Sequence, residues 1–185
     1  MELGNLSPGL ILTTVVGLAL LPYLAVMVTS FTKLVVVFSL LRNALGLQQT
    51  PPNMVINGLA IILSIYVMYP VGLKMSAVAQ ETGLGRSSDT GSVLHGLDQA
   101  KEPLRDFMIR HTAEAERHFF HKTAQRLLDE KEKALISDRD LIVVVPAFTV
   151  SELTAAFQIG LLIFLPFLII DLVVSNILQA MGMMM

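Results

Sequence analysis

Three long stretches of the chain are almost entirely apolar and carry no charged side chain. They are residues 3–32, residues 43–73 and residues 153–170, and the chain beyond Asp171 is again uncharged. An apolar run of roughly 18 or more residues is long enough to cross a membrane as a helix. The pattern therefore predicts a protein built around membrane-length helices.

The first two apolar runs predict a helical hairpin. One helix is expected over about Pro8–Leu41, interrupted by Lys33, and the other over about Asn53–Met75. Between them lie Gly46 and the Pro51–Pro52 pair. These residues end one helix and allow the next to begin, because proline has no backbone N–H and a fixed φ.

The third apolar run begins near Leu141 and continues to the end of the chain. Its first residues, LIVVV, are β-branched and fit a strand by local propensity. Pro146 and the long apolar continuation favour a helix instead. The run ends in several methionines, and Gly182 among them permits a bend.

The segment between the hairpin and the third run is polar. Residues 76–140 hold ten Lys or Arg, twelve Asp or Glu and all four histidines. We therefore expect this segment to lie outside the membrane. Helical spacing of apolar residues predicts one helix over about 93–108, kinked or divided at Pro103, and a second over about 112–135. The predicted units are a hydrophobic hairpin (1–75), a polar helical domain (76–140) and a C-terminal hydrophobic helix (141–185).

Composition and charge narrow the class further. Hydrophobic residues make up 54% and charged residues 15% of the chain, whereas about 25% of a soluble domain is charged. The net charge of −2 argues against a nucleic-acid partner, and the absence of cysteine excludes disulfides.

The charges near the turn of the hairpin predict its orientation in the membrane. Lys33 and Arg42 lie in or beside the segment that joins the two helices, and this region contains no Asp or Glu. The positive-inside rule then places this joint in the cytoplasm and the polar domain outside, which is the periplasm for a bacterial inner membrane.

Prolines and polar residues inside the apolar runs are untypical of lipid-facing helices. They are Pro22, Pro70, Pro166, Asn57, Ser64, Gln158 and Asn176, with the charged Lys33 and Asp171. Lipid offers such groups no partner, and a charge at mid-bilayer costs roughly 2.5–3.5 kcal/mol. Ala156 and Gly160 form a small-xxx-small pair that allows two helices to approach closely. Two interpretations stay open: tolerated irregularity in a multi-pass protein, or burial in a larger assembly.

Glu152 directly follows Ser151 and has two interpretations. In the first turn of a helix, its carboxylate would complement the helix dipole and Ser151 would cap the backbone. The alternative is a contact with another subunit.

Four potential metal ligands lie along one side of a predicted helix. They are His111, Glu114, His118 and His121, a set that suits zinc by its donors. That side points away from the apolar stripe of the same helix, which favours a solvated polar face. No HExxH, GxSxG or P-loop pattern occurs. We therefore predict a protein that is not an enzyme and has no metal or other cofactor.

Three stretches of the sequence resemble one bacterial family. They are LLRNALGLQQTPPNMVINGLAIILSIYVMYPVG (residues 40–72), PLRDFM (residues 103–108) and PAFTVSELTAAFQIGLLIFLPFLIIDLVVSNILQAMGMMM (residues 146–185). Through them the chain is similar to the FliP/SctR (YscR) family, the inner-membrane export-apparatus proteins of flagellar and virulence type III secretion. The PPNMVINGLA segment resembles the virulence, or injectisome, branch more than the flagellar one.

The resemblance implies an all-α, non-enzymatic protein that assembles as a homo-oligomeric ring of about five copies. With smaller membrane partners of the SctS/FliQ and SctT/FliR type, the ring forms a pore through which unfolded protein substrates leave the cell. This export gate lies largely on the periplasmic side of the inner membrane. The family pattern continues into one more apolar helix after the methionine run, so we expect such a helix to follow Met185.

The resemblance also implies where the function resides. The candidate pore gasket is Met183, Met184 and Met185, because methionine has three rotatable bonds and a polarizable thioether and packs irregular surfaces. The alternative is that the methionines are simply apolar filler at a helix end. The predicted contacts between ring subunits are Phe107, Phe119 and Glu152.

A stand-alone solute transporter or channel is the alternative function. It requires an ionisable pathway inside the apolar runs, and the candidate pair is Lys33 with Asp171. Copurification with two small hydrophobic proteins favours export, whereas a monomer with ligand-dependent stability favours transport.

Overall fold

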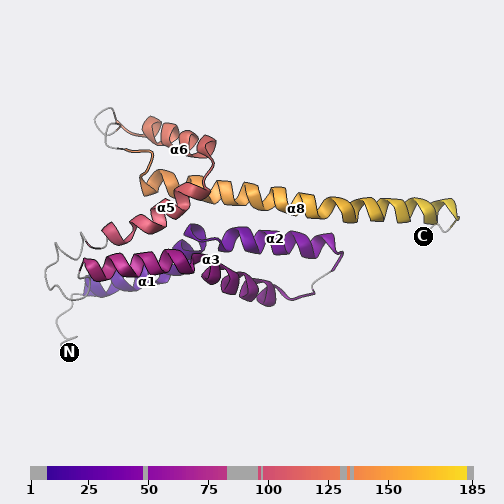
Figure 1. Cartoon of the computed structure of the whole chain (residues 1–185), viewed down its shortest axis with the longest axis horizontal. Coiled ribbons are helices and arrows are strands. Elements are labelled where there is room, and N and C mark those ends of the chain that lie inside the picture. Colours follow the sequence, from indigo (N-terminus) through magenta and orange to yellow (C-terminus); the bar gives the residue numbers. More distant parts are fainter. Residues whose placement is uncertain are drawn as a thin grey trace.

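The described part of the chain is all-helical, as predicted. The computed structural model describes residues 8–47, 50–82, 96, 98–129, 133 and 136–182, and this part contains no strand. Its helices are α1 (Pro8–Val28), α2 (Phe31–Ala44), α3 (Asn53–Glu81), α5 (Glu102–His111), α6 (Glu114–Leu127) and α8 (Leu141–Ala180). In Figure 1, α8 lies along the long axis of the molecule, with α2 beside its first half and α6 on the opposite side of it from α3.

The first apolar run is two helices and not one, so the prediction of a single helix over Pro8–Leu41 was wrong. The break lies at Thr29 and Ser30, and α1 and α2 meet at 66°. Threonine side chains occupy backbone groups there: the Phe31 N–H donates to Thr29 Oγ1 at 3.4 Å, and Thr32 Oγ1 donates to the Val26 carbonyl at 3.0 Å. Such local hydrogen bonds compete with the helical ladder.

The turn between α2 and α3 follows the prediction from Gly46 and the proline pair. Gly46 has a φ of 67°, a left-handed conformation that suits glycine, and α3 begins one residue after Pro52. Arg42 Nη1 donates to Asn53 Oδ1 at 2.6 Å and fastens the two helix ends together. Helix α3 then continues to Glu81, beyond the predicted end at Met75.

The third apolar run is a continuous helix of 40 residues, which confirms the choice of helix over strand. At 1.5 Å per residue it is about 60 Å long. Both Pro146 and Pro166 lie inside it. Its second half extends beyond the other helices in Figure 1, and every residue from Leu168 to Gly182 is exposed.

The polar segment forms shorter helices than predicted. Pro103 lies in the first turn of α5 and separates it from helical residues 98–100, so the predicted division at this proline is confirmed. Helix α6 ends at Leu127, whereas the pattern predicted about Leu135.

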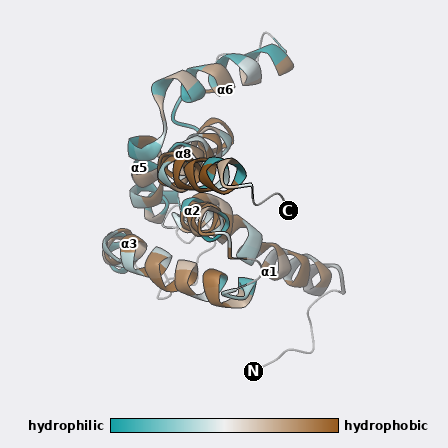
Figure 2. Cartoon of the chain, turned by 90° about the vertical axis from the view of Figure 1, so that its right-hand side faces the viewer, coloured by the Kyte–Doolittle hydropathy of each residue, from teal (hydrophilic) through white to brown (hydrophobic). Residues whose placement is uncertain are grey.

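The buried core lies where α5 crosses the first part of α8. Met108 of α5 and Val144 and Phe148 of α8 are buried there. The Phe107 ring lies 6.0 Å from the Phe148 ring, between centroids. This small core anchors α5 to α8. Figure 2 shows the hydrophilic residues of α5 and α6 on the side of α8 that faces away from α1.

Much of the apolar surface is uncovered in the isolated chain. Helices α3 and α8 are long and apolar enough to cross a membrane, and α1 with α2 adds a third span if the bent pair counts as one. In the most apolar 18-residue window of α3, 17% of the residues are buried, and in that of α8 none is. Lipid or other protein must therefore cover these faces.

Candidate functional site

A buried ion pair joins α2 to α8. Lys33 Nζ lies 2.7 Å from Glu152 Oε1, and the side chain of Glu152 is 3% exposed while that of Lys33 is 29% exposed. A carboxylate in such a setting needs a nearby cation, because burial strongly disfavours an uncompensated charge. The pair therefore fixes how the two helices cross.

The neighbouring residue ties the polar segment to the same turn of α8. Ser151 is buried, and its Oγ accepts a hydrogen bond of 3.0 Å from the backbone N–H of Ala113. Ala113 is the residue just before α6. Residues 151 and 152 thus hold α2 and the start of α6 against one turn of α8.

This geometry corrects the interpretation of Glu152 as a first-turn residue. Helix α8 begins at Leu141, so Glu152 and Ser151 lie well inside it and cannot complement its N-terminal dipole. The pattern predicted the start of this run near Leu141, and the first-turn interpretation of Glu152 overlooked this. It also missed Lys33 as the partner, because no local spacing relates residues on two distant helices.

Helices α2 and α8 also approach closely two turns further along α8. Ala156 and Gly160 are buried, and a side chain at Gly160 would lie 3.0 Å from Leu40 Cβ and closer still to its Cδ1. The predicted small-xxx-small contact is confirmed, and its partner is α2 of the same chain.

Asp171 is not brought to Lys33. It lies exposed in the second half of α8 and has no ion-pair partner among the described residues. The ionisable pair that the transporter alternative requires is therefore not formed, because Lys33 is held by Glu152 instead.

The two predicted aromatic contacts differ in their surroundings. Phe107 is half-buried between the Phe148 and His111 rings, with centroid distances of 6.0 and 4.4 Å. Phe119 is 62% exposed and stacks edge-on against Phe120 at 5.3 Å. Phe119 is thus available to another molecule, whereas much of Phe107 is used within the chain.

The methionine gasket falls on Met183, Met184 and Met185, which lie outside the described residues. Just before these methionines, Gly182 follows α8 and has a φ of 74°. A left-handed residue directly after the helix agrees with the predicted bend at this glycine.

The four candidate zinc ligands, for which the sequence favoured a solvated polar face, are not gathered around one point. Among the described residues no group of three His, Cys, Asp or Glu side chains is placed to hold a metal ion. His121 Nε2 lies 3.2 Å from the Ile136 carbonyl, and His111 Nδ1 lies 2.8 Å from the Phe107 carbonyl. These two rings are engaged with the backbone.

Comparison with known proteins decides the family. The family model described as the FliP family matches residues 12–185. The chain belongs to the FliP family. It is 51% identical over 175 residues to "Pathogenicity-related ORF2" of Xanthomonas campestris pv. glycines, covering 94% of this chain and 80% of that protein. The predicted resemblance is therefore confirmed.

Other relatives come from both virulence and flagellar systems. The chain is 51% identical over 168 residues to Yop proteins translocation protein R of Yersinia pestis, covering 91% of this FliP-family chain and 77% of that protein. It is 42% identical over 174 residues to the flagellar biosynthetic protein FliP of Pectobacterium carotovorum, covering 94% and 65% respectively.

Proposed function

We propose that this chain is a pore-forming core subunit of a type III secretion export apparatus, a gate that conducts unfolded proteins across the bacterial inner membrane. The observation that supports this proposal most directly is the FliP-family match over residues 12–185. The relatives include proteins whose names contain "translocation protein" and "secretion protein". The greater identity to the virulence relatives than to the flagellar ones favours the injectisome branch.

The uncovered second half of α8 supports a role in an assembly. From Leu168 onward α8 is exposed, and Asp171 is the charged residue of this part of the helix. A lone carboxylate on such a helix is costly in lipid but acceptable against a polar or basic partner helix. We propose that other subunits cover it: further copies of this chain in a ring of about five, and two small membrane proteins of the SctS/FliQ and SctT/FliR type.

The gate itself is assigned to the methionines after α8. In a ring, Met183, Met184 and Met185 of each copy recur around one axis directly after the long helix. Soft thioether side chains close on one another and yet deform around a passing polypeptide. The anchored α2–α8 crossing gives this seal a rigid base, since the Lys33–Glu152 pair holds the first half of α8.

The proposed placement in the cell follows from the charge pattern. The hairpin (1–75) and the C-terminal helix (141–185) provide the apolar surface, and the polar helical domain (76–140) lies in the periplasm.

The experiment is purification of the whole protein from detergent-solubilised membranes, with its genomic neighbours co-expressed. A ring of several copies that retains two small hydrophobic proteins is the expected result. A monomer without them contradicts the proposal. In the native host, deletion of the gene is expected to abolish secretion of type III substrates while membrane integrity is kept.

A further inference from the structure

A groove between α3 and α5 is a feature that the proposed export role leaves unexplained. It has a volume of about 460 Å³ and runs along the second half of α3. One wall is apolar, with Val67, Val71 and Val78 of α3 and Phe107 of α5. The groove therefore offers a hydrophobic surface beside a helix that is itself long and apolar enough to span a membrane.

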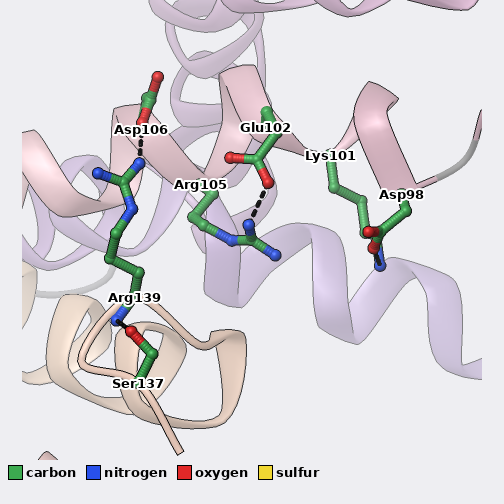
Figure 3. Close-up of polar contacts among 7 residues, drawn as sticks. All are labelled: Asp98, Lys101, Glu102, Arg105, Asp106, Ser137 and Arg139. Carbon is green, nitrogen blue, oxygen red and sulfur yellow. Dashed lines mark hydrogen bonds and ion pairs between the residues drawn. The ribbon is translucent and has the colours of Figure 1, made fainter.

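Two acidic residues line the groove, and arginines outside the lining hold both. Glu102 is paired with Arg105 on the same helix, and Asp106 Oδ1 accepts a hydrogen bond of 2.9 Å from Arg139 Nη2 (Figure 3). Arg139 precedes α8, and its backbone N–H donates to Ser137 Oγ at 3.3 Å. The two carboxylates are thereby compensated from outside the groove.

Two cations that line the same groove have no such partner. Lys74 comes from α3 and Arg110 from α5, and within the described part of the chain neither forms an ion pair. Lys74 is exposed and is the single charge on α3 before Glu81. The uncompensated charge of the groove is therefore positive, although Lys74 and Arg110 are matched in number by Glu102 and Asp106.

We propose that this groove binds an anionic phospholipid. The phosphate of the headgroup lies between Lys74 and Arg110, and an acyl chain lies along the valines of α3. Basic pockets beside membrane helices recognise anionic headgroups in this way. An inorganic anion would use the cations but leave the apolar wall bare, so the mixed lining favours a lipid.

The test measures lipid binding to the purified full chain by native mass spectrometry, with phosphatidylglycerol as the probe. Phosphatidylethanolamine is the zwitterionic comparison and inorganic phosphate the comparison without acyl chains. We expect preferential retention of phosphatidylglycerol. Lys74→Gln and Arg110→Gln are each expected to weaken it about fivefold, which corresponds to about 1 kcal/mol per cation.

Arg139→Gln gives a sharper test, because Arg139 does not line the groove. Its loss frees the Asp106 carboxylate, which does line the groove, and we expect phosphatidylglycerol binding to weaken although no lipid contact is removed. Asp106→Asn in the same chain should restore it. Arg126→Gln, which changes an exposed cation on α6, is the matched control and should leave binding unchanged. Circular dichroism checks that each variant keeps its helix content.

Four outcomes overturn the proposal. Equal retention of the two phospholipids shows that the groove does not select an anionic headgroup. Unchanged binding in both Lys74→Gln and Arg110→Gln places the lipid elsewhere. Competition by inorganic phosphate at the same concentration assigns the groove to a free anion. A change of oligomeric state in these variants, without a change in bound lipid, assigns it to an acidic surface of another protein.

Discussion

Lys33 on α2 and Glu152 on α8 form an ion pair whose nitrogen and oxygen lie 2.7 Å apart, with the carboxylate almost fully buried. The adjacent Ser151 fixes the residue before α6 through a hydrogen bond of 3.0 Å. Two consecutive residues of α8 therefore hold α2 and the start of α6, while the part of the same helix from Leu168 onward is exposed. This division separates a rigid base from a surface that is open to other subunits.

Removal of the cation from this pair should destabilise the chain more than removal of the acid's charge. Lys33→Met leaves Glu152 buried without a cation, and breaking such a pair costs about 3–5 kcal/mol. Because Lys33 is partly exposed, we expect the lower end, or a fall of about 6–12 °C in the thermal midpoint measured by circular dichroism in detergent. Glu152→Gln should cost less, since the lysine reaches solvent. The double variant Lys33→Met with Glu152→Met should recover most of the loss; strictly additive losses would contradict a direct coupling.

Substitution of Gly160 tests the close approach of α2 and α8. Gly160→Ala places a methyl group against Leu40, and overpacking of this kind costs about 1–3 kcal/mol. Leu40→Ala in the same chain should relieve the clash. Gly72→Ala is the matched control, because nothing lies within 4 Å of a side chain there. It should raise the thermal midpoint slightly, as alanine favours a helix by about 0.5–1 kcal/mol over glycine. A Gly160→Ala variant as stable as Gly72→Ala would refute this contact.

Loss of the Ser151 hydroxyl should loosen the attachment of α6. Ser151→Ala leaves the Ala113 N–H without its acceptor, at a cost of about 1 kcal/mol. Hydrogen exchange at the start of α6 should accelerate while exchange in α3 stays unchanged. Thr154→Ala serves as the control, because Thr154 lies at an exposed position of α8, the helix that carries Ser151. Uniform acceleration over all helices would indicate general destabilisation instead.

Phe119 should matter for assembly and not for folding. Its side chain is 62% exposed, so Phe119→Ala is expected to change the thermal midpoint of the monomer little but to reduce the yield of the assembled ring in size-exclusion chromatography. Phe148→Ala, in the buried core, should instead cost about 3–5 kcal/mol in stability. An unaltered ring in the Phe119 variant argues against this residue as a subunit contact.

The methionine gasket predicts a leak. Replacement of Met183, Met184 and Met185 together by alanine shortens every side chain of the proposed seal, so cells that express the assembled variant should conduct small ions while they continue to secrete. Met54→Ala, at a methionine that is 85% exposed near the start of α3, is the control and should not leak. Conductance equal to that of the unchanged protein would count against a seal at these residues.

The uncharged runs, the helix-breaking residues and the resemblance to a known family together predicted most of the helices of this fold. The apolar length of residues 141–180 forces a helix where local β-propensity suggests a strand, and Gly46 with two prolines forces the α2–α3 turn. Local pattern did not reveal the break at Thr29 and Ser30, because it depends on side chain to backbone hydrogen bonds, among them Thr149 Oγ1 of α8 to the Met27 carbonyl at 3.4 Å.

The sequence by itself determined the helical class, the family and the apolar surfaces, since these follow from periodicity, length and long motifs. Only the tertiary structure decided the partners: Lys33 with Glu152 and not with Asp171, Gly160 with Leu40, and Lys74 with Arg110 around one groove. The physical reason is that charge pairing and close packing depend on which helix faces meet in space. Spacing along one helix carries no information about a partner on another.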